Sequence, residues 1–171
     1  MTETREIGVG LISVGWMGKL HTRAYQAMPS VYPELGVRCR LVIAADTAPD
    51  RVEYAKDVLG YERGTTDYRE VLADPDVDVV SICAPNMLHR EIGIAAAKAG
   101  KPFWIEKPVG RDSRETAEVA TAAREAGVAT SIGPTTYWTR SATWLSRSPM
   151  APLPENSRRK RHERAPSGSL A

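Results

Sequence analysis

The sequence predicts an α/β domain built on a doubly wound parallel sheet, followed by a poorly ordered tail. Three observations lead to this prediction. Short apolar runs alternate with segments of helical periodicity, which is typical of a parallel sheet covered by helices on both faces. A glycine-rich turn follows the first apolar run, and the regular alternation stops near Gly133 of the 171 residues. We therefore divide the chain into a domain at 1–133 and an Arg/Ser/Pro-rich tail at 134–171.

The predicted strands are apolar over nearly their whole length, as expected for strands that are buried on both faces. Right-handed crossovers join parallel strands, so such a series favours a doubly wound sheet. The run at Arg63–Thr66 is the weakest of the set. The six expected strands are Ile7–Ile12, Leu41–Ala45, Arg63–Thr66, Val77–Cys83, Pro102–Glu106 and Val128–Ile132.

Helix start and stop signals separate these strands. Thr47 is a capping residue placed before a proline that suits the first helical position. Asp67 and Asp112 each precede a helical pattern and have a glutamate three residues later, as in a capping box. Gly127 ends the pattern that Asp112 opens, and Gly100 ends a further helical pattern, in the way that glycine commonly ends helices.

A phosphate-binding turn is predicted after the first strand. Ser13-Val14-Gly15-Trp16-Met17-Gly18 precedes a helix over Lys19–Met28. In the Gly-x-Gly-x-x-Gly fingerprint, the glycines make the tight turn, admit the pyrophosphate and let the helix pack against the strand. Serine occupies the first glycine position here, and any tight strand–helix turn is the alternative interpretation. The placement favours dinucleotide binding at the helix N-terminus, with Ser13, Gly15, Trp16, Met17 and Gly18 as cofactor-binding residues.

Asp46 ends the second predicted strand and indicates which dinucleotide is bound. A carboxylate at this point accepts hydrogen bonds from the adenosine ribose and repels a 2′-phosphate, which favours NAD over NADP. Arg51 lies nearby in the sequence and weakens that preference, so NADP stays possible. A helix-capping role for Asp46 is the alternative, and the two roles are compatible.

Three local sequences together resemble the glucose–fructose oxidoreductase and inositol 2-dehydrogenase family. They are Gly15-Trp16-Met17-Gly18 with His21, Ala84-Pro85-Asn86 with His89, and Glu106-Lys107-Pro108, and each follows a predicted strand. The resemblance spans residues 5–133, which corresponds to the family's N-terminal NAD(P)-binding domain of Rossmann type. It implies hydride transfer between a nicotinamide cofactor and a secondary alcohol of a sugar or cyclitol.

The resemblance also implies roles for single residues. Pro85 and Asn86 are expected to line the pocket beside the cofactor, and Lys107 to lie near the nicotinamide and the substrate. Oxidation of an alcohol releases the hydroxyl proton, and a lysine beside a positively charged ring can accept it, so Lys107 is the expected catalytic residue. Glu106 is expected to orient Lys107 beside the cofactor. His89 either faces the cofactor or is a structural residue near the start of its helix.

The family's members continue into a second α/β domain that supplies much of the substrate site and usually the oligomer interface. Nothing in 134–171 corresponds to that domain, so we expect a truncated oxidoreductase whose oligomeric state stays open. A non-catalytic nucleotide-binding module is the first alternative. An interaction protein that uses the basic run at 158–164 is the second. A change of reading frame near Gly133 is a further hypothesis for the break in pattern.

Composition restricts the other classes of function. The formal net charge is only +2, and the basic run is not accompanied by the motif of a nucleic-acid-binding domain, so nucleic-acid binding is not expected. No stretch approaches the roughly 18 apolar residues of a membrane span, and the polar start predicts no secretory signal. The two cysteines lack metal-binding spacing. We expect a cytoplasmic protein whose partners are a nicotinamide dinucleotide and a polyol or sugar.

Overall fold

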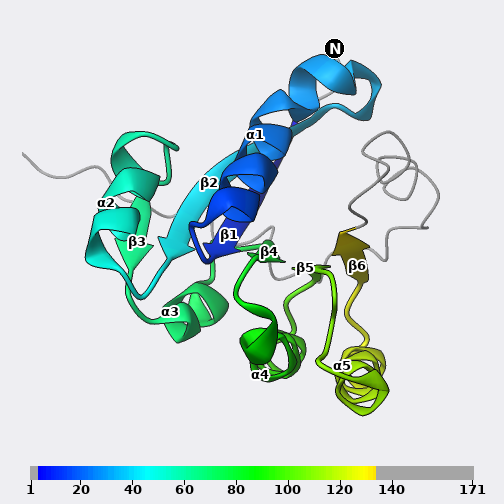
Figure 1. The fold of residues 1–171 in the computed structure, drawn as a ribbon. Helices are drawn as coiled ribbons and strands as arrows, with labels where there is room; N and C mark the ends of the chain where they lie inside the picture. The colour runs from blue at the N-terminus through cyan, green and yellow to red at the C-terminus, as the bar shows by residue number, and fades with distance from the viewer. Residues whose placement is uncertain (1–3, 134–171) are drawn as a thin grey trace, which may run out of the picture. The chain divides into compact units, whose positions relative to one another are not determined.

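The structure is a computed structural model that describes residues 4–133. Its six parallel strands form one sheet in the order β3-β2-β1-β4-β5-β6 (Figure 1). The chain therefore moves outward from the centre of the sheet in both directions, which is the doubly wound order. The predicted fold class is confirmed. The predicted tail at 134–171 lies outside the described residues, and the domain boundary stays a prediction.

Strands and helices alternate along the described chain. The strands are β1 (Arg5–Ile12), β2 (Val37–Ala45), β3 (Arg63–Thr65), β4 (Val79–Ile82), β5 (Phe103–Glu106) and β6 (Thr130–Gly133). The helices are α1 (Trp16–Val31), α2 (Pro49–Asp57), α3 (Tyr68–Ala73), α4 (Asn86–Lys98) and α5 (Ser113–Ala126), with the 3-10 turn η1 at Pro33–Leu35.

The clearest difference from the prediction is the length of β2. It begins at Val37 rather than Leu41, and its first residue pairs with Arg5 at the start of β1. Polar residues such as Arg38 and Arg40 interrupt this first part of the strand, so a search for continuous apolar runs misses it. The extension makes β1 and β2 the longest pair of neighbouring strands in the sheet.

The hydrophobic core has one layer on each face of the sheet. Val9 and Leu11 of β1 pack with Leu59 in a cluster on the side of α1 and α2. Ile82 and Ile105, on β4 and β5, belong to the cluster on the side of α3, α4 and α5 (Figure 1). Helices α1 and α2 cover one face of the sheet, and α3, α4 and α5 cover the other. The carboxyl ends of the strands lie between these two layers and stay accessible.

The helix caps partly follow the sequence signals. The carboxylates of Asp67 and Asp112 accept backbone N–H groups in the first turns of α3 and α5, at 2.9 and 2.8 Å. The prediction that Thr47 caps α2 is wrong, because the N-cap residue is Ala48 and no side chain caps the helix. Instead, the Asp46 carboxylate accepts the Ala48 N–H at 3.1 Å.

Candidate functional site

The predicted site residues gather at the carboxyl ends of four neighbouring strands. The turn Ser13–Gly18 follows β1, Asp46 follows β2, and Asn86 follows β4. Glu106 and Lys107 lie at the end of β5. Because helices leave β1 and β4 on opposite faces, the sheet opens a crevice between these two strand ends, where ligands of doubly wound folds bind.

The turn after β1 has the backbone geometry of the glycine fingerprint although it begins with serine. Ser13 has φ +76°, in the left-handed region that favours glycine. A Cβ atom on Gly18 would lie 2.3 Å from the carbonyl oxygen of Ser13, so only glycine fits there. Among the described residues, no side chain caps α1 and no acidic residue lies in its first turn. The start of α1 is therefore suited to a bound anion.

The Asp46 carboxylate holds the turn against the end of β2. Its Oδ2 atom accepts the Val14 N–H at 2.8 Å, and its Oδ1 atom accepts the Ala48 N–H at 3.1 Å. The guanidinium of Arg51 lies 3.8 Å from Oδ2. A carboxylate has about four acceptor positions, so Asp46 retains capacity for ribose hydroxyls while it braces the turn.

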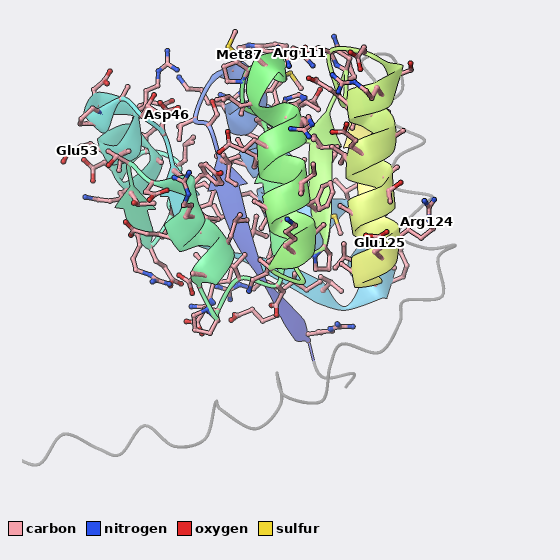
Figure 2. All side chains as sticks on the ribbon, turned by 90° about the horizontal axis from the view of Figure 1, so that it is seen from below. Asp46, Glu53, Met87, Arg111, Arg124 and Glu125 are labelled. Carbon is pink, nitrogen blue, oxygen red and sulfur yellow. The ribbon has the colours of Figure 1, made fainter. Side chains whose placement is uncertain are left out.

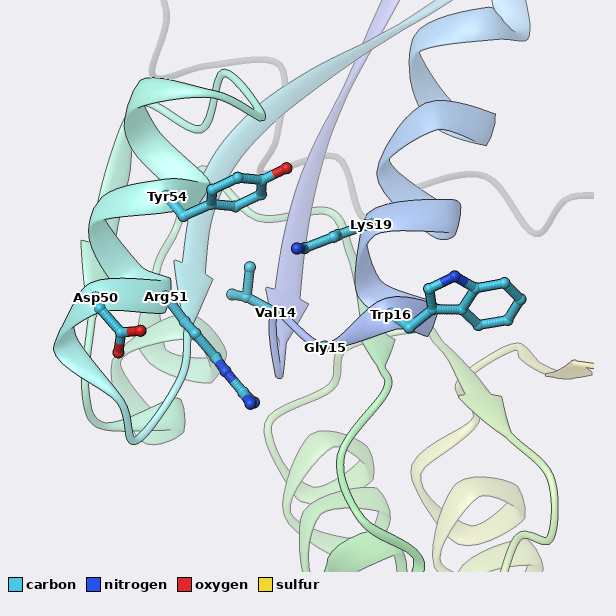
Figure 3. Close-up of a pocket in the computed structure, with 7 residues that line it drawn as sticks. All are labelled: Val14, Gly15, Trp16, Lys19, Asp50, Arg51 and Tyr54. Atoms are coloured by element: carbon cyan, nitrogen blue, oxygen red, sulfur yellow. The ribbon is translucent and has the colours of Figure 1, made fainter.

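A hollow of about 350 Å³ lies between the turn and α2 (Figure 3). Two cations face it, because Arg51 points toward the turn and Lys19 places its Nζ 4.2 Å from the ring centroid of Tyr54. The Trp16 ring points away from α2, to the other side of the turn (Figure 3). Lys19 and Tyr54 were not among the predicted site residues, since neither belongs to a motif.

A buried chain of polar side chains connects α1 to the ends of β4 and β5. The Nε2 atom of His21 lies 2.8 Å from Oε1 of Glu106, and its Nδ1 atom lies 2.6 Å from the Ser81 hydroxyl. The ring of Trp104 packs against His21 in a tilted arrangement, with centroids 4.1 Å apart and 32° between the ring planes. The Glu106 carboxylate therefore faces α1, and its contact with Lys107 is to the backbone N–H, at 3.4 Å.

The start of α4 holds the turn that carries Lys107. The carbonyl oxygen of Pro108 lies 2.8 Å from both Nδ2 of Asn86 and Nδ1 of His89. The other ring nitrogen of His89 lies 2.7 Å from the carbonyl oxygen of Ala84. A neutral ring has one N–H and donates to one of these carbonyls at a time. His89 is buried and both of its nitrogens are used within the domain, whereas Lys107 is exposed.

Cys83 lies at the end of β4 among these groups. Burial raises the pKa of its thiol above the usual range, and the nearby Glu106 charge acts in the same direction. The thiol therefore stays protonated and is a poor nucleophile. Within residues 4–133, no group of His, Cys, Asp and Glu side chains is arranged to hold a metal ion, and no helix is long and apolar enough to cross a membrane.

Comparison with known proteins places the described domain in one family. A model of an oxidoreductase family with an NAD-binding Rossmann fold matches residues 7–133. Levoglucosan dehydrogenase of Pseudarthrobacter phenanthrenivorans is 40% identical over 127 residues, which are 72% of this chain and 32% of that protein. Myo-inositol 2-dehydrogenase of Thermotoga maritima is 32% identical over 101 residues, which are 59% of this chain and 28% of that protein. The chain thus spans about a third of the length of the curated relatives it matches.

Solved structures agree with the sequence comparison. Levoglucosan dehydrogenase in complex with NADH and levoglucosan aligns with a TM-score of 0.72 and 37% identity, over 75% of this chain and 35% of that chain. An NAD-binding oxidoreductase from Klebsiella pneumoniae aligns with the same TM-score and 40% identity, over 75% of this chain and 34% of that one. The resemblance indicated by the three motifs is confirmed.

Proposed function

The chain belongs to the oxidoreductase family with the NAD-binding Rossmann fold, and from this premise we propose a dehydrogenase site in which Lys107 exchanges the substrate proton. The substrate class is a secondary alcohol of a sugar or cyclitol. The observation that carries the proposal is the exposure of Lys107 at the carboxyl end of β5, directly beside β4 and its crevice. Relatives named for levoglucosan and myo-inositol support the substrate class.

The residues present fit a nicotinamide dinucleotide. The N-terminus of α1 and the close packing at Gly18 suit the pyrophosphate. Asp46 retains acceptor positions for the adenosine ribose. We assign Pro85 and Asn86 to the nicotinamide end of the crevice, and the buried His89 supports that end through the carbonyl oxygens of Ala84 and Pro108. When bound, the nicotinamide ring supplies the acceptor for the hydride of the alcohol carbon.

Lys107 acts on the other half of the reaction. A neutral amine at this position accepts the proton as the substrate O–H bond breaks, and it returns a proton to the carbonyl oxygen in the reverse direction. Proton transfer by a positioned side chain contributes about 10²–10⁴-fold to the rate. The bonds from Asn86 and His89 to Pro108 keep the backbone of this turn in place. Glu106, the residue before Lys107, is fixed in the core by its contact with His21.

Calorimetric titration of the full chain with NADH tests cofactor binding. Turnover is then measured as NAD reduction with levoglucosan, myo-inositol and a panel of polyols. We expect Lys107→Ala to bind NADH with unchanged affinity and to lose turnover by about 10²-fold or more. Lys98→Ala, which removes an exposed lysine from the last turn of α4, is the matched control.

Three outcomes separate the alternatives. Undiminished turnover in Lys107→Ala contradicts the assigned role. NADH binding without turnover on any alcohol favours a nucleotide-binding module that lacks catalysis. No heat and no change in tryptophan emission at saturating NADH or NADPH contradicts the cofactor site itself.

A further inference from the structure

Two large apolar side chains project into solvent at the end of the sheet that carries the cofactor site. Trp16 is 72% exposed and Met87 is 69% exposed, the two highest values among the exposed large hydrophobic residues of the described chain. Each lies at the very start of a helix, Trp16 in α1 and Met87 in α4. Ligand sites are lined mainly by hydrophobic and aromatic side chains, so these two side chains are suited to contact a ligand in the crevice.

The topology places the two residues at the starts of helices that flank one crevice from opposite faces of the sheet. The helices α1 and α4 follow β1 and β4, which are neighbours in the sheet, and they cover opposite faces. Trp16 lines the hollow at the turn, but its ring points away from α2 and from the cations Arg51 and Lys19 (Figure 3). Met87 lies at the end of α4 that faces the carboxyl edge of the sheet (Figure 2).

The backbone at Met87 is fixed relative to the turn that carries Lys107. Its neighbour Asn86 donates to the Pro108 carbonyl oxygen at 2.8 Å, and His89 contacts the same oxygen at 2.8 Å. These two bonds join the first turn of α4 to the residue after Lys107. The thioether of Met87 is therefore carried on a backbone that is anchored beside the proposed proton-transfer residue.

We propose that Met87, opposite Trp16, packs against the nicotinamide ring of the bound cofactor and positions it beside Lys107. This inference rests on the proposed function, because it assigns the nicotinamide end of the same site. A planar aromatic ring suits these partners, since a thioether packs favourably on a ring and an indole attracts the cationic oxidised form. Met87 belongs to none of the three motifs and is a positioning residue rather than a catalytic one.

The test compares NADH with ADP-ribose, which keeps both riboses and both phosphates and lacks only the nicotinamide ring. NADH and ADP-ribose are titrated by calorimetry into the full chain and into Met87→Ala, with Met87→Leu as the conservative variant. We expect Met87→Ala to weaken NADH about fivefold or more and ADP-ribose less than about twofold, with Met87→Leu retaining most of the NADH affinity. Val58→Ala, which removes a 62% exposed apolar side chain at the C-terminus of α2, is the matched control and leaves both affinities unchanged.

The outcomes distinguish this inference from the proposed function. If wild-type chain binds neither ligand, the proposed function fails and the inference fails with it. If both ligands bind but Met87→Ala weakens them equally, Met87 acts through the fold and not on the nicotinamide ring. If Met87→Ala binds NADH as tightly as wild type, the exposed side chain serves another contact, such as a second copy of the chain, and the inference is overturned.

Discussion

The Nε2 atom of His21 lies 2.8 Å from Oε1 of Glu106, although 85 residues separate the two along the chain. Both side chains are nearly inaccessible, at 1% and 9% exposed. Helix α1 therefore contacts the end of β5 through a polar pair, one residue before Lys107. The pair links helix α1 to the proposed proton-transfer turn.

The first prediction concerns this pair. His21→Ala leaves the Glu106 carboxylate buried without its imidazole partner, which lowers the free energy of unfolding by about 3 kcal/mol. The measurement is urea unfolding followed by circular dichroism. The control is the double variant His21→Ala/Glu106→Gln, which we expect to be more stable than His21→Ala because no carboxylate charge is left unpaired. Equal stability of His21→Ala and wild type would show that the pair has no stabilising role, and equal stability of the two variants would show that the unpaired carboxylate has no cost.

The second prediction concerns the left-handed backbone at Ser13. Ser13→Gly removes the steric cost of a side chain at φ +76° and is expected to stabilise the domain by about 1 kcal/mol, after the greater freedom of glycine in the unfolded chain is included. Ser13→Ala keeps a Cβ atom and gives no such gain. Thermal and urea unfolding of both variants measure the difference. A Ser13→Gly variant no more stable than Ser13→Ala would argue against strain at this turn.

The third prediction concerns the double use of Asp46. Asp46→Asn removes a carboxylate oxygen that accepts the Val14 N–H, so we expect stability to fall by about 1–2 kcal/mol. NADH affinity falls about tenfold or more, and NADPH affinity falls less, because the repulsion of a 2′-phosphate is lost with the charge.

Calorimetric titration with both cofactors measures this shift in preference. Asp50→Asn is the control, because Asp50 lines the same hollow but is exposed. A variant that loses stability without a change in the NADH-to-NADPH ratio would leave Asp46 with its bracing role alone.

The fourth prediction is a dependence of stability on pH. Hydrogen bonds from the Arg111 side chain and backbone lower the pKa of Glu115 from 4.5 to about 2. The carboxylate therefore stabilises the folded state fully above the unfolded pKa, and this contribution disappears as pH falls toward the folded pKa. Urea unfolding should show Glu115→Gln less stable than wild type at neutral pH, with the difference vanishing between about pH 5 and about pH 2.

Glu125→Gln, at an exposed position near the end of the same helix, provides the comparison for Glu115. Its difference from wild type should be small and nearly constant over the same range. A difference for Glu115→Gln that stays constant down to about pH 2 would contradict the assigned shift.

Much of the fold could be predicted from periodicity alone. The apolar runs correspond to strands, of which the inner ones are buried on both faces over most of their length. Asp67 and Asp112 cap the helices as their spacing indicates. The start of β2 at Val37 and the uncapped α2 after Thr47 could not be predicted, because a partner strand and the Asp46 carboxylate decide them. A local sequence pattern does not predict the start of a strand or helix where a residue outside that pattern supplies the hydrogen bond.

The sequence by itself determined the doubly wound fold, the glycine turn after β1 and the three motifs, because strand and helix periods and strand-end residues are local properties of the chain. Tertiary structure decided which of those residues meet. His21 pairs with Glu106, Asp46 braces Val14, and Met87 is left exposed beside the Lys107 turn. These relationships depend on the order of strands in the sheet. That order brings together segments that are far apart in the sequence, and no local pattern in the sequence indicates these contacts.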